Sequence, residues 1–437
     1  MAPSFIAAST IAFLVGILLP SAANGSGIPN IKATFGNAPA PFQLDVDPEF
    51  IRETHEKVAR AVAPTALADA PDDGPSVQDY TAIRDFWVNN YTWESVQQSI
   101  NSRFHQFTTT VQNENSDYTE PVPLHYVHHT SPRTDAIPML FIHGWPGSFL
   151  EVGPIINLLT NPPNASLPAF HVVAPSIPGF GFSPAPTRSG FGPKEAGHAF
   201  NSLMMQLNYT KYVINGGDLG AFVLRHQAAS YPSNVVSTIC NFWLIQPNAT
   251  DLSRFASNQT TEDESYYIQG VQAYQNERSG YRYVHQTEPL SISYAMTDSP
   301  IGYAMWIYSL MNGATDRRVR NWSPEEVITW TLMYLIQGPY GSLRFYKEAV
   351  SDGDWVGFGF GDFPFVEQPT AISLFPYDLW YRLPLDWAQR RGNVTARYLH
   401  DRGDHFPAYG TPELFASDIW AFFGNESLSG VEAFRSV

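Results

Sequence analysis

The chain has 437 residues, which is enough for one large domain with insertions or for two ordinary domains. Apolar residues make up 44% of it and charged residues 15%, so we expect a large buried core and not a disordered chain. Its formal net charge is −16 and it contains no basic block, which argues against nucleic acid as a partner.

Residues 1–24 have the composition of a cleaved secretory signal peptide. An apolar run from Phe5 to Leu19 is short for a membrane span, and small residues follow it at positions 21–23. No lysine or arginine precedes this run, so an uncleaved membrane anchor is the alternative. Contact with a membrane is expected only in that second case.

Eight N-x-[ST] triplets are spread over the whole chain and also indicate export. Such glycosylation acceptor sites favour a glycoprotein that is secreted or faces the lumen of the secretory pathway. The asparagines concerned are Asn90, Asn164, Asn208, Asn248, Asn258, Asn321, Asn393 and Asn425. The lone Cys240 can form no internal disulfide, so the fold must depend on its core, in which we expect this thiol to be buried.

Residues 25–110 are predicted to form an N-terminal arm. It begins with an extended piece and a helix in "PEFIRETHEKVARAV", followed by the loop "APTALADAPDDGPS". The helical segment "YTAIRDFWVNNYTWESVQQSINSRFHQF" comes next. Its aromatic residues Trp87, Trp93 and Phe107 are expected to pack against the main body.

Residues 111–257 and 365–437 alternate between short buried strands and helices. The strands expected in the first part are "PLHYVHH", "IPMLFIHG", "FHVVAPSIPG" and "YVINGGD", and those in the second are "PTAISLF" and "TARYLHDRG". This alternation predicts a doubly wound α/β sheet, mostly parallel, with helices on both faces. Residues 258–364 are mostly helical and rich in aromatics, which predicts a helical lid inserted into that core.

A tight glycine turn follows the strand "YVING" and carries a single carboxylate. The stretch from Gly216 to Gly220 matches the nucleophile-elbow spacing G-x-Nuc-x-G, with Asp218 at the position of the nucleophile. Small flanking residues suit the strained backbone of such a turn, and the following helix N-terminus favours negative charge. The alternative is that Asp218 only caps that helix.

Two further motifs suit the same chemistry. The loop "HGWP" resembles the one that lends a backbone N–H to the oxyanion hole of α/β-hydrolases, although a plain Gly/Pro turn is the alternative. His405 follows the last strand, which is where the order nucleophile, acid, histidine places the base. Its acid is expected to be Asp378 in "SLFPYDLW", with the adjacent Asp404 as the rival.

In their order and spacing these motifs resemble the microsomal-type epoxide hydrolases. The resemblance extends from Ile28 to the C-terminus and includes "HGWPGSF", "GGDLG", "ERSGY", "DSPIG", "RFYKE", "FPYD" and "HF". It implies an α/β-hydrolase fold with a helical lid and an N-terminal wrapping arm. It also implies an epoxide as the small-molecule substrate and no metal or organic cofactor, and the apolar, aromatic-rich lid suggests that this epoxide is lipophilic or aryl.

The resemblance further implies a role for each site residue. Asp218 would open the epoxide and form an alkyl ester, while Tyr281 and Tyr346 donate to the epoxide oxygen. Water activated by His405 and Asp378 would then hydrolyse the ester to release a diol. The N–H groups of Trp145 and Leu219 would hold the oxyanion of that step.

Two residues depart from the family pattern. Leu219 stands where the family usually has tryptophan, which is expected to change the wall of the pocket. Asp404 stands where glycine is common before the histidine, and its charge could compete with Asp378 for the imidazole. Neither departure removes a catalytic group.

Other activities remain open at this stage. A haloalkane dehalogenase shares the aspartate nucleophile but usually has tryptophan after it, where this chain has Leu219. A biosynthetic relative could steer the epoxide into cyclisation or rearrangement, and a catalytically silent secreted binding protein could retain the scaffold. Metal is not expected at "HYVHH", because strand alternation separates His128 from His129, and no carboxylate is spaced to join these two or His125. The oligomeric state is open, a homodimer included.

Overall fold

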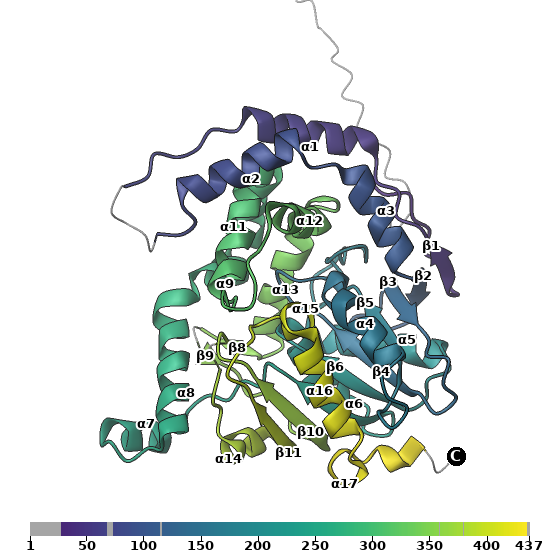
Figure 1. The fold of residues 1–437 in the computed structure, drawn as a ribbon, viewed down its shortest axis with the longest axis vertical. Helices are drawn as coiled ribbons and strands as arrows, with labels where there is room; N and C mark the ends of the chain where they lie inside the picture. Colours follow the sequence, from purple (N-terminus) through teal and green to yellow (C-terminus); the bar gives the residue numbers. More distant parts are fainter. Residues whose placement is uncertain (1–27, 68–72, 114–115, 358, 379, 435–437) are drawn as a thin grey trace, which may run out of the picture.

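The computed structural model describes residues 28–67, 73–113, 116–357, 359–378 and 380–434 (Figure 1). The expected signal peptide of residues 1–24 therefore lies outside the described residues. Within the described ranges, no helix has both the length and the apolar character needed to cross a membrane.

A nine-stranded sheet is the centre of the described part of the chain, with strand order β1-β2-β3-β5-β4-β6-β7-β10-β11. The strands from β5 to β11 in this order are parallel, whereas β1, β2 and β3 pair antiparallel at one edge. Their bounds are Ala40–Phe42, Gln106–Val111, Val122–His129, Ile137–Ile142, Phe170–Pro175, Tyr212–Gly216, Val235–Cys240, Val366–Leu374 and Gly392–Leu399 for β1 to β7, β10 and β11. This mostly parallel sheet confirms the predicted α/β-hydrolase fold.

Helices cover the sheet in two groups. One group contains α4, α15 and α16, which pack on one another, and in the other α5 packs on α6. The central strands are nearly all apolar and buried because helices cover both faces. The helices of these groups are α4 (Gly153–Thr160), α5 (Pro193–Gln206), α6 (Leu219–Ser230), α15 (Pro407–Gly410) and α16 (Pro412–Phe423). Shorter elements near them are η1 (Phe149–Val152), α14 (Leu385–Ala388), η3 (Gln389–Arg391), α17 (Glu426–Ser429) and η4 (Val431–Phe434).

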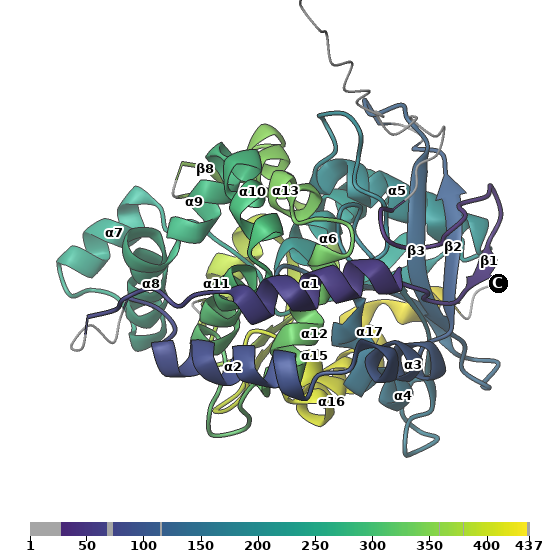
Figure 2. The ribbon, with the colours of Figure 1, turned by 90° about the horizontal axis from the view of Figure 1, so that it is seen from above.

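The N-terminal arm forms three helices, of which the first two lie across the lid (Figure 2). These are α1 (Pro48–Arg60), α2 (Val77–Asn89) and α3 (Trp93–Arg103), and Figure 2 shows α1 and α2 running over α11 and α12. The single helical segment expected here is broken at residues 90–92, because Thr92 is extended and starts a new helix. Trp87 and Trp93 are buried, as expected, and the expected arm boundary at residue 110 falls inside β2.

The lid lies between β7 and β10 and is almost entirely helical. It packs α13 against α9 and α10, and α12 against α11 and the arm helix α2. Its helices are α7 (Ala249–Ala256), α8 (Glu262–Ala273), the π-helical turn η2 (Tyr274–Arg278), α9 (Gly280–Thr287), α10 (Pro289–Asp298), α11 (Pro300–Gly313), α12 (Pro324–Leu335) and α13 (Tyr340–Ser351). A small hairpin of β8 (Trp355–Val356) and β9 (Gly359–Phe360) follows α13.

The parallel register brings the predicted site motifs to one edge of the sheet. Ile142 at the end of β4 pairs with Gly216 at the end of β6, and Gly216 pairs with Cys240 at the end of β7. The loops that leave β4, β6, β10 and β11 carry Trp145, Asp218, Asp378 and His405. Since the carboxyl ends of parallel strands share an edge, these four residues meet beneath the lid.

Candidate active site

Asp218 occupies a sharp turn between β6 and α6, with φ of 49° and ψ of −127°. This left-handed backbone is uncommon for a residue with a side chain and is tolerated where its surroundings hold it in place. The surroundings are tight, because a Cβ on Gly220 would lie 2.3 Å from the carbonyl oxygen of Ile142. A Cβ on Gly144 would lie 2.3 Å from the Cβ of Asp218.

The carboxylate of Asp218 does not cap the helix that it precedes. Its side chain makes no capping hydrogen bond to α6, which contradicts the alternative of a simple helix cap. Instead, Oδ1 accepts a hydrogen bond of 2.8 Å from the backbone N–H of Trp145. Oδ2 lies 3.3 Å from Nε2 of His405. The carboxylate therefore lies between an oxyanion-type donor and an imidazole.

His405 has Asp378 on its other side. Its Nδ1 lies 3.3 Å from Oδ2 of Asp378. Burial alone would lower the pKa of His405. The negative charges and hydrogen bonds of Asp378 and Asp218 raise this pKa by more, so that it lies well above its usual value. The rival acid Asp404 instead accepts a hydrogen bond of 3.2 Å from the N–H of Phe406, and burial raises the pKa of Asp404 to about 7.

The lid brings Tyr281 and Tyr346 above this group, from α9 and α13. The ring of Tyr281 stacks on Trp145 at 5.6 Å, and the ring of Tyr346 meets Trp145 edge-on at 5.9 Å. The two phenol rings are 6.2 Å apart. Burial, reinforced by Asp218 among the neighbouring groups, raises the pKa of both phenols well above the usual value, so both remain protonated donors.

A cavity of about 510 Å³ opens onto Asp218 and His405. It falls within the size range of small-molecule sites, which are mostly apolar with a few placed polar groups. Apolar and aromatic residues line it: Tyr274, Tyr281, Trp306 and Leu310 come from the lid, and Trp380 and Phe406 from the loops after β10 and β11. Besides Asp218, Asp378 and His405, the charged lining residues are Glu277 and Arg278, and both of these are exposed.

Comparison with known proteins agrees with this geometry. Residues 39–152 match the family described as "Epoxide hydrolase N terminus", and residues 137–300 match the one described as "alpha/beta hydrolase fold". Epoxide hydrolase 1 of the pig (Sus scrofa) is 30% identical over 412 residues, which is 88% of each chain. The chain belongs to the epoxide hydrolase family. The expected enzyme class is thereby confirmed.

Two solved structures share the fold of this epoxide hydrolase. The Aspergillus niger epoxide hydrolase has a TM-score of 0.75 at 23% identity, covering 92% of this chain and 99% of its own. The juvenile hormone epoxide hydrolase of the silkworm Bombyx mori has a TM-score of 0.78 at 21% identity, covering 89% and 95%. At 23% and 21% identity, these similarities show a shared fold and nothing further.

The side chain of Leu219 does not reach the active site of the epoxide hydrolase. Its expected effect on substrate preference stays a prediction, and the side chain itself is 1% exposed and is not among the residues that line the cavity. The reason is its position as the first residue of α6, where its side chain packs in the core. Its N–H belongs to the first turn of a helix, whose amides have no partner within the helix.

Sequence reasoning missed one buried acid, Glu151, beside Asp218 of the epoxide hydrolase. Oε1 of Glu151 accepts a hydrogen bond of 3.4 Å from the N–H of Gly144, and burial raises the pKa of Glu151 to about 8. A small cavity of about 10 Å³, close to the volume that one water molecule needs, is lined by Glu151, Asp218, Asn241 and His405 among others. The signal was present as a lone carboxylate within the apolar stretch "GSFLEV".

The histidines of "HYVHH" in the epoxide hydrolase have protein partners. The ring of His125 lies 2.9 Å from Oγ of Ser176 and 3.1 Å from Oε1 of Gln106. His128 contacts the hydroxyl of Tyr209 at 3.0 Å, and His129 accepts a hydrogen bond of 3.0 Å from a backbone N–H. Each of the three imidazole rings is therefore held by at least one hydrogen bond within the protein.

Proposed function

We propose that this enzyme hydrolyses a lipophilic epoxide to a vicinal diol through an ester on Asp218. The observation that supports it best is the placement of this carboxylate between the N–H of Trp145 and the imidazole of His405. Because Oδ1 is held by the N–H of Trp145, Oδ2 is the oxygen that attacks carbon. The apolar lining of the cavity favours a lipophilic substrate.

In the first step, Oδ2 of Asp218 attacks an epoxide carbon and the ring C–O bond breaks. The electrons of that bond go to the ring oxygen, which takes a proton from Tyr281 or Tyr346. Both phenols are suited to this transfer because they are buried and protonated. The product of the step is a hydroxyalkyl ester of Asp218.

Ester formation prepares His405 for the second step. It removes the negative charge of Asp218, one of the two carboxylates that hold the pKa of His405 high. The pKa of the imidazole then falls, and Nε2 can accept a proton from water. The cavity beside Asp218 and His405 is close to the size of this water.

Water then attacks the carbonyl carbon of Asp218, and the charge that develops on Oδ1 is held by the N–H groups of Trp145 and Leu219. Each such donor is typically worth about 3–4 kcal/mol of barrier. Collapse of the intermediate breaks the bond between the carbonyl carbon and the alkyl oxygen. The alkoxide takes the proton from His405 and the diol leaves. Asp218 is then a carboxylic acid, and its proton returns to the tyrosinate formed in the first step, which restores both the carboxylate and the phenol.

The test is product analysis with a panel of aryl and alkyl epoxides, run on the wild type, Asp218→Asn and His405→Gln. We expect diol from the wild type and none from Asp218→Asn, whose circular dichroism spectrum controls for folding. His405→Gln should accumulate an enzyme heavier by one substrate mass. A product other than diol would favour cyclisation or rearrangement, and diol from Asp218→Asn would exclude the ester route.

We also propose that the chain is made in the secretory pathway. All eight acceptor asparagines are exposed in the fold, including Asn90, Asn164 and Asn321. A glycosyltransferase needs exposed acceptors, and a random set of eight positions would be expected to include buried ones. This supports a secreted or lumenal location and glycosylation.

A further inference from the structure

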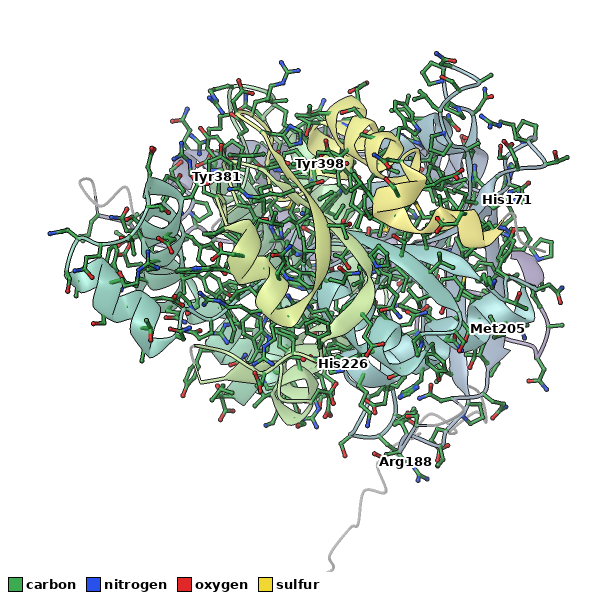
Figure 3. All side chains as sticks on the ribbon, turned by 90° about the horizontal axis from the view of Figure 1, so that it is seen from below. His171, Arg188, Met205, His226, Tyr381 and Tyr398 are labelled. Carbon is green, nitrogen blue, oxygen red and sulfur yellow. The ribbon has the colours of Figure 1, made fainter. Side chains whose placement is uncertain are left out.

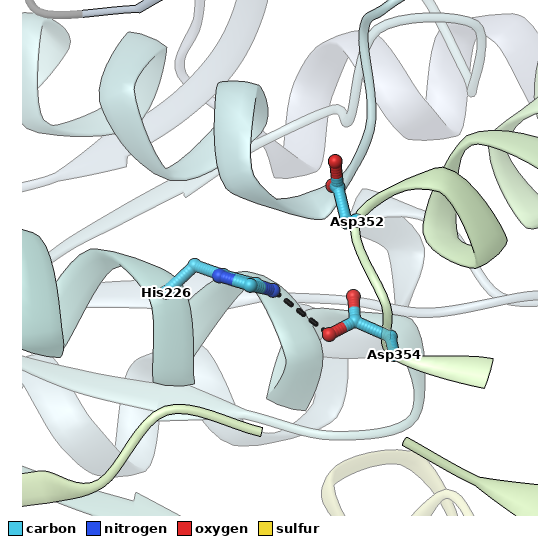
Figure 4. A group of neighbouring side chains, drawn as sticks. All are labelled: His226, Asp352 and Asp354. Atoms are coloured by element: carbon cyan, nitrogen blue, oxygen red, sulfur yellow. Dashed lines mark hydrogen bonds and ion pairs between the residues drawn. The ribbon is translucent and has the colours of Figure 1, made fainter. Parts of the chain in front are cut away.

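A group of titratable side chains outside the active site has the composition of a metal site. His226 lies on α6, and Asp352 and Asp354 lie just after α13 (Figure 4). Each offers one nitrogen or oxygen atom, and these atoms lie within 4.8 Å of one another. Gly353, with φ of 85°, turns the chain between the two aspartates.

Of the two oxygens of the buried Asp354 carboxylate, one has a hydrogen-bond partner among the described residues. Its Oδ1 lies 2.8 Å from Nε2 of His226, whereas its Oδ2 is buried without a hydrogen-bond partner among the described residues. Figure 4 shows this second oxygen on the side of the carboxylate that faces Asp352. Asp354 is 1% exposed, and a buried carboxylate oxygen without a partner is costly. A cation at this place would satisfy it.

The charge around this group is unbalanced. Asp352, Asp354 and the buried Glu195 bring three carboxylates together, and burial with the charge of Asp352 raises the pKa of Glu195 to about 7. The imidazole of His226 contacts one of them, Asp354. Lys194 gives its backbone N–H to Asp352 at 3.0 Å, but its ammonium group pairs with Asp117 at 3.6 Å.

We propose that His226, Asp352 and Asp354 bind a divalent first-row transition metal such as Zn²⁺. An imidazole nitrogen with two carboxylate oxygens suits Zn²⁺ or Mn²⁺ better than Mg²⁺ or Ca²⁺, which prefer oxygen ligands alone. Bonds of about 2.1 Å require ligand atoms about 3.4 Å apart, so shifts of about 1 Å complete the set. Nε2 of His226 exchanges its contact with Asp354 for the metal.

Such a metal would join the lid to the helix beneath the nucleophile. His226 lies on α6, which begins directly after Asp218, and the two aspartates follow α13, which carries Tyr346. Asp352 also lies at the start of α5, through the N–H of Lys194. The metal is therefore expected to stabilise the attachment of the lid without touching the substrate.

The experiment measures the melting temperature of the full chain after treatment with EDTA, with Zn²⁺, Mn²⁺, Mg²⁺ or Ca²⁺ added. We expect Zn²⁺ or Mn²⁺ at 100-fold excess over its dissociation constant to raise Tm by about 3 °C or more, with one ion bound by calorimetry. Mg²⁺ and Ca²⁺ should give much smaller shifts. His226→Gln and Asp354→Asn should each lose the rise.

The matched control is His105→Gln. His105 stacks on His129 at 4.4 Å, so this pair is another place where Zn²⁺ could bind by chance. Figure 3 labels His226 among the side chains of the whole molecule. The control should keep the full shift.

Two results would overturn the proposal. One is that neither Zn²⁺ nor Mn²⁺ changes Tm or binds by calorimetry, in which case protons shared among the carboxylates balance the charge. The other is an equal shift in His226→Gln and Asp354→Asn, which would place the metal elsewhere. If either variant fails to fold, Asp352→Asn with direct calorimetry of Zn²⁺ gives the same decision.

Discussion

At the residue scale, two phenols stand over Asp218, and the rings of both contact the indole of Trp145. Single Tyr281→Phe and Tyr346→Phe variants are expected to slow ester formation about 10- to 100-fold, because the remaining phenol still donates. The double variant should lose more than either. Single-turnover rapid quench measures this, with Tyr283→Phe, an exposed neighbour on α9, as control. Equal rates in all variants would remove the tyrosines from the mechanism.

The buried Glu151 is expected to make the free energy of unfolding depend on pH. Because burial raises its folded pKa to about 8, the folded carboxyl stays neutral between pH 4.5 and 8 while the unfolded one ionises. The free energy of unfolding is therefore highest at low pH. It falls as the pH rises through this window, by about 1.4 kcal/mol per pH unit. Glu151→Gln removes this loss. Its Tm relative to the wild type should rise between pH 5 and pH 8, and a constant difference would contradict the buried neutral acid.

At the scale of elements, the elbow between β6 and α6 depends on a close approach of backbone. A methyl group on Gly220 would lie 2.3 Å from the carbonyl oxygen of Ile142, and backbone cannot move aside cheaply. Gly220→Ala is expected to cost about 1–3 kcal/mol of stability and to lower turnover by displacing Asp218. Gly36→Ala, where nothing lies within 4 Å of the new methyl, is the control. Thermal melting and the rate of ester formation measure both effects.

The sequence predicted the elements that have strong local signals and missed those defined by contacts. Buried strands bounded by turns, such as "IPMLFI", were located because their apolar runs are continuous. The break at residues 90–92 has no glycine or proline to mark it. His226 and Asp354 are 128 positions apart, so only the folded chain brings them together. Asp218 and His405 were located because their spacing is tied to the fold type.

At the scale of the whole molecule, the eight exposed acceptor asparagines predict a glycoprotein. Chain expressed through a eukaryotic secretory pathway should lose mass on treatment with a peptide N-glycosidase. Peptide mapping should then show conversion to aspartate at several of these sites. A secreted chain with the mass of the bare polypeptide would contradict glycosylation, and chain retained in the cytosol would contradict the proposed location.

The two oxygens of Asp218 are not equivalent, since Oδ1 is held by Trp145 and Oδ2 faces His405. If Oδ2 attacks and water later restores the carboxylate, the atom given to the product comes from the protein. The first diol made by each enzyme molecule then carries an oxygen that entered the chain during translation. In ¹⁸O-labelled water this first diol is unlabelled, the enzyme gains 2 Da, and label reaches the product only in later cycles. On this proposed route the enzyme replaces one of its own oxygen atoms in every cycle.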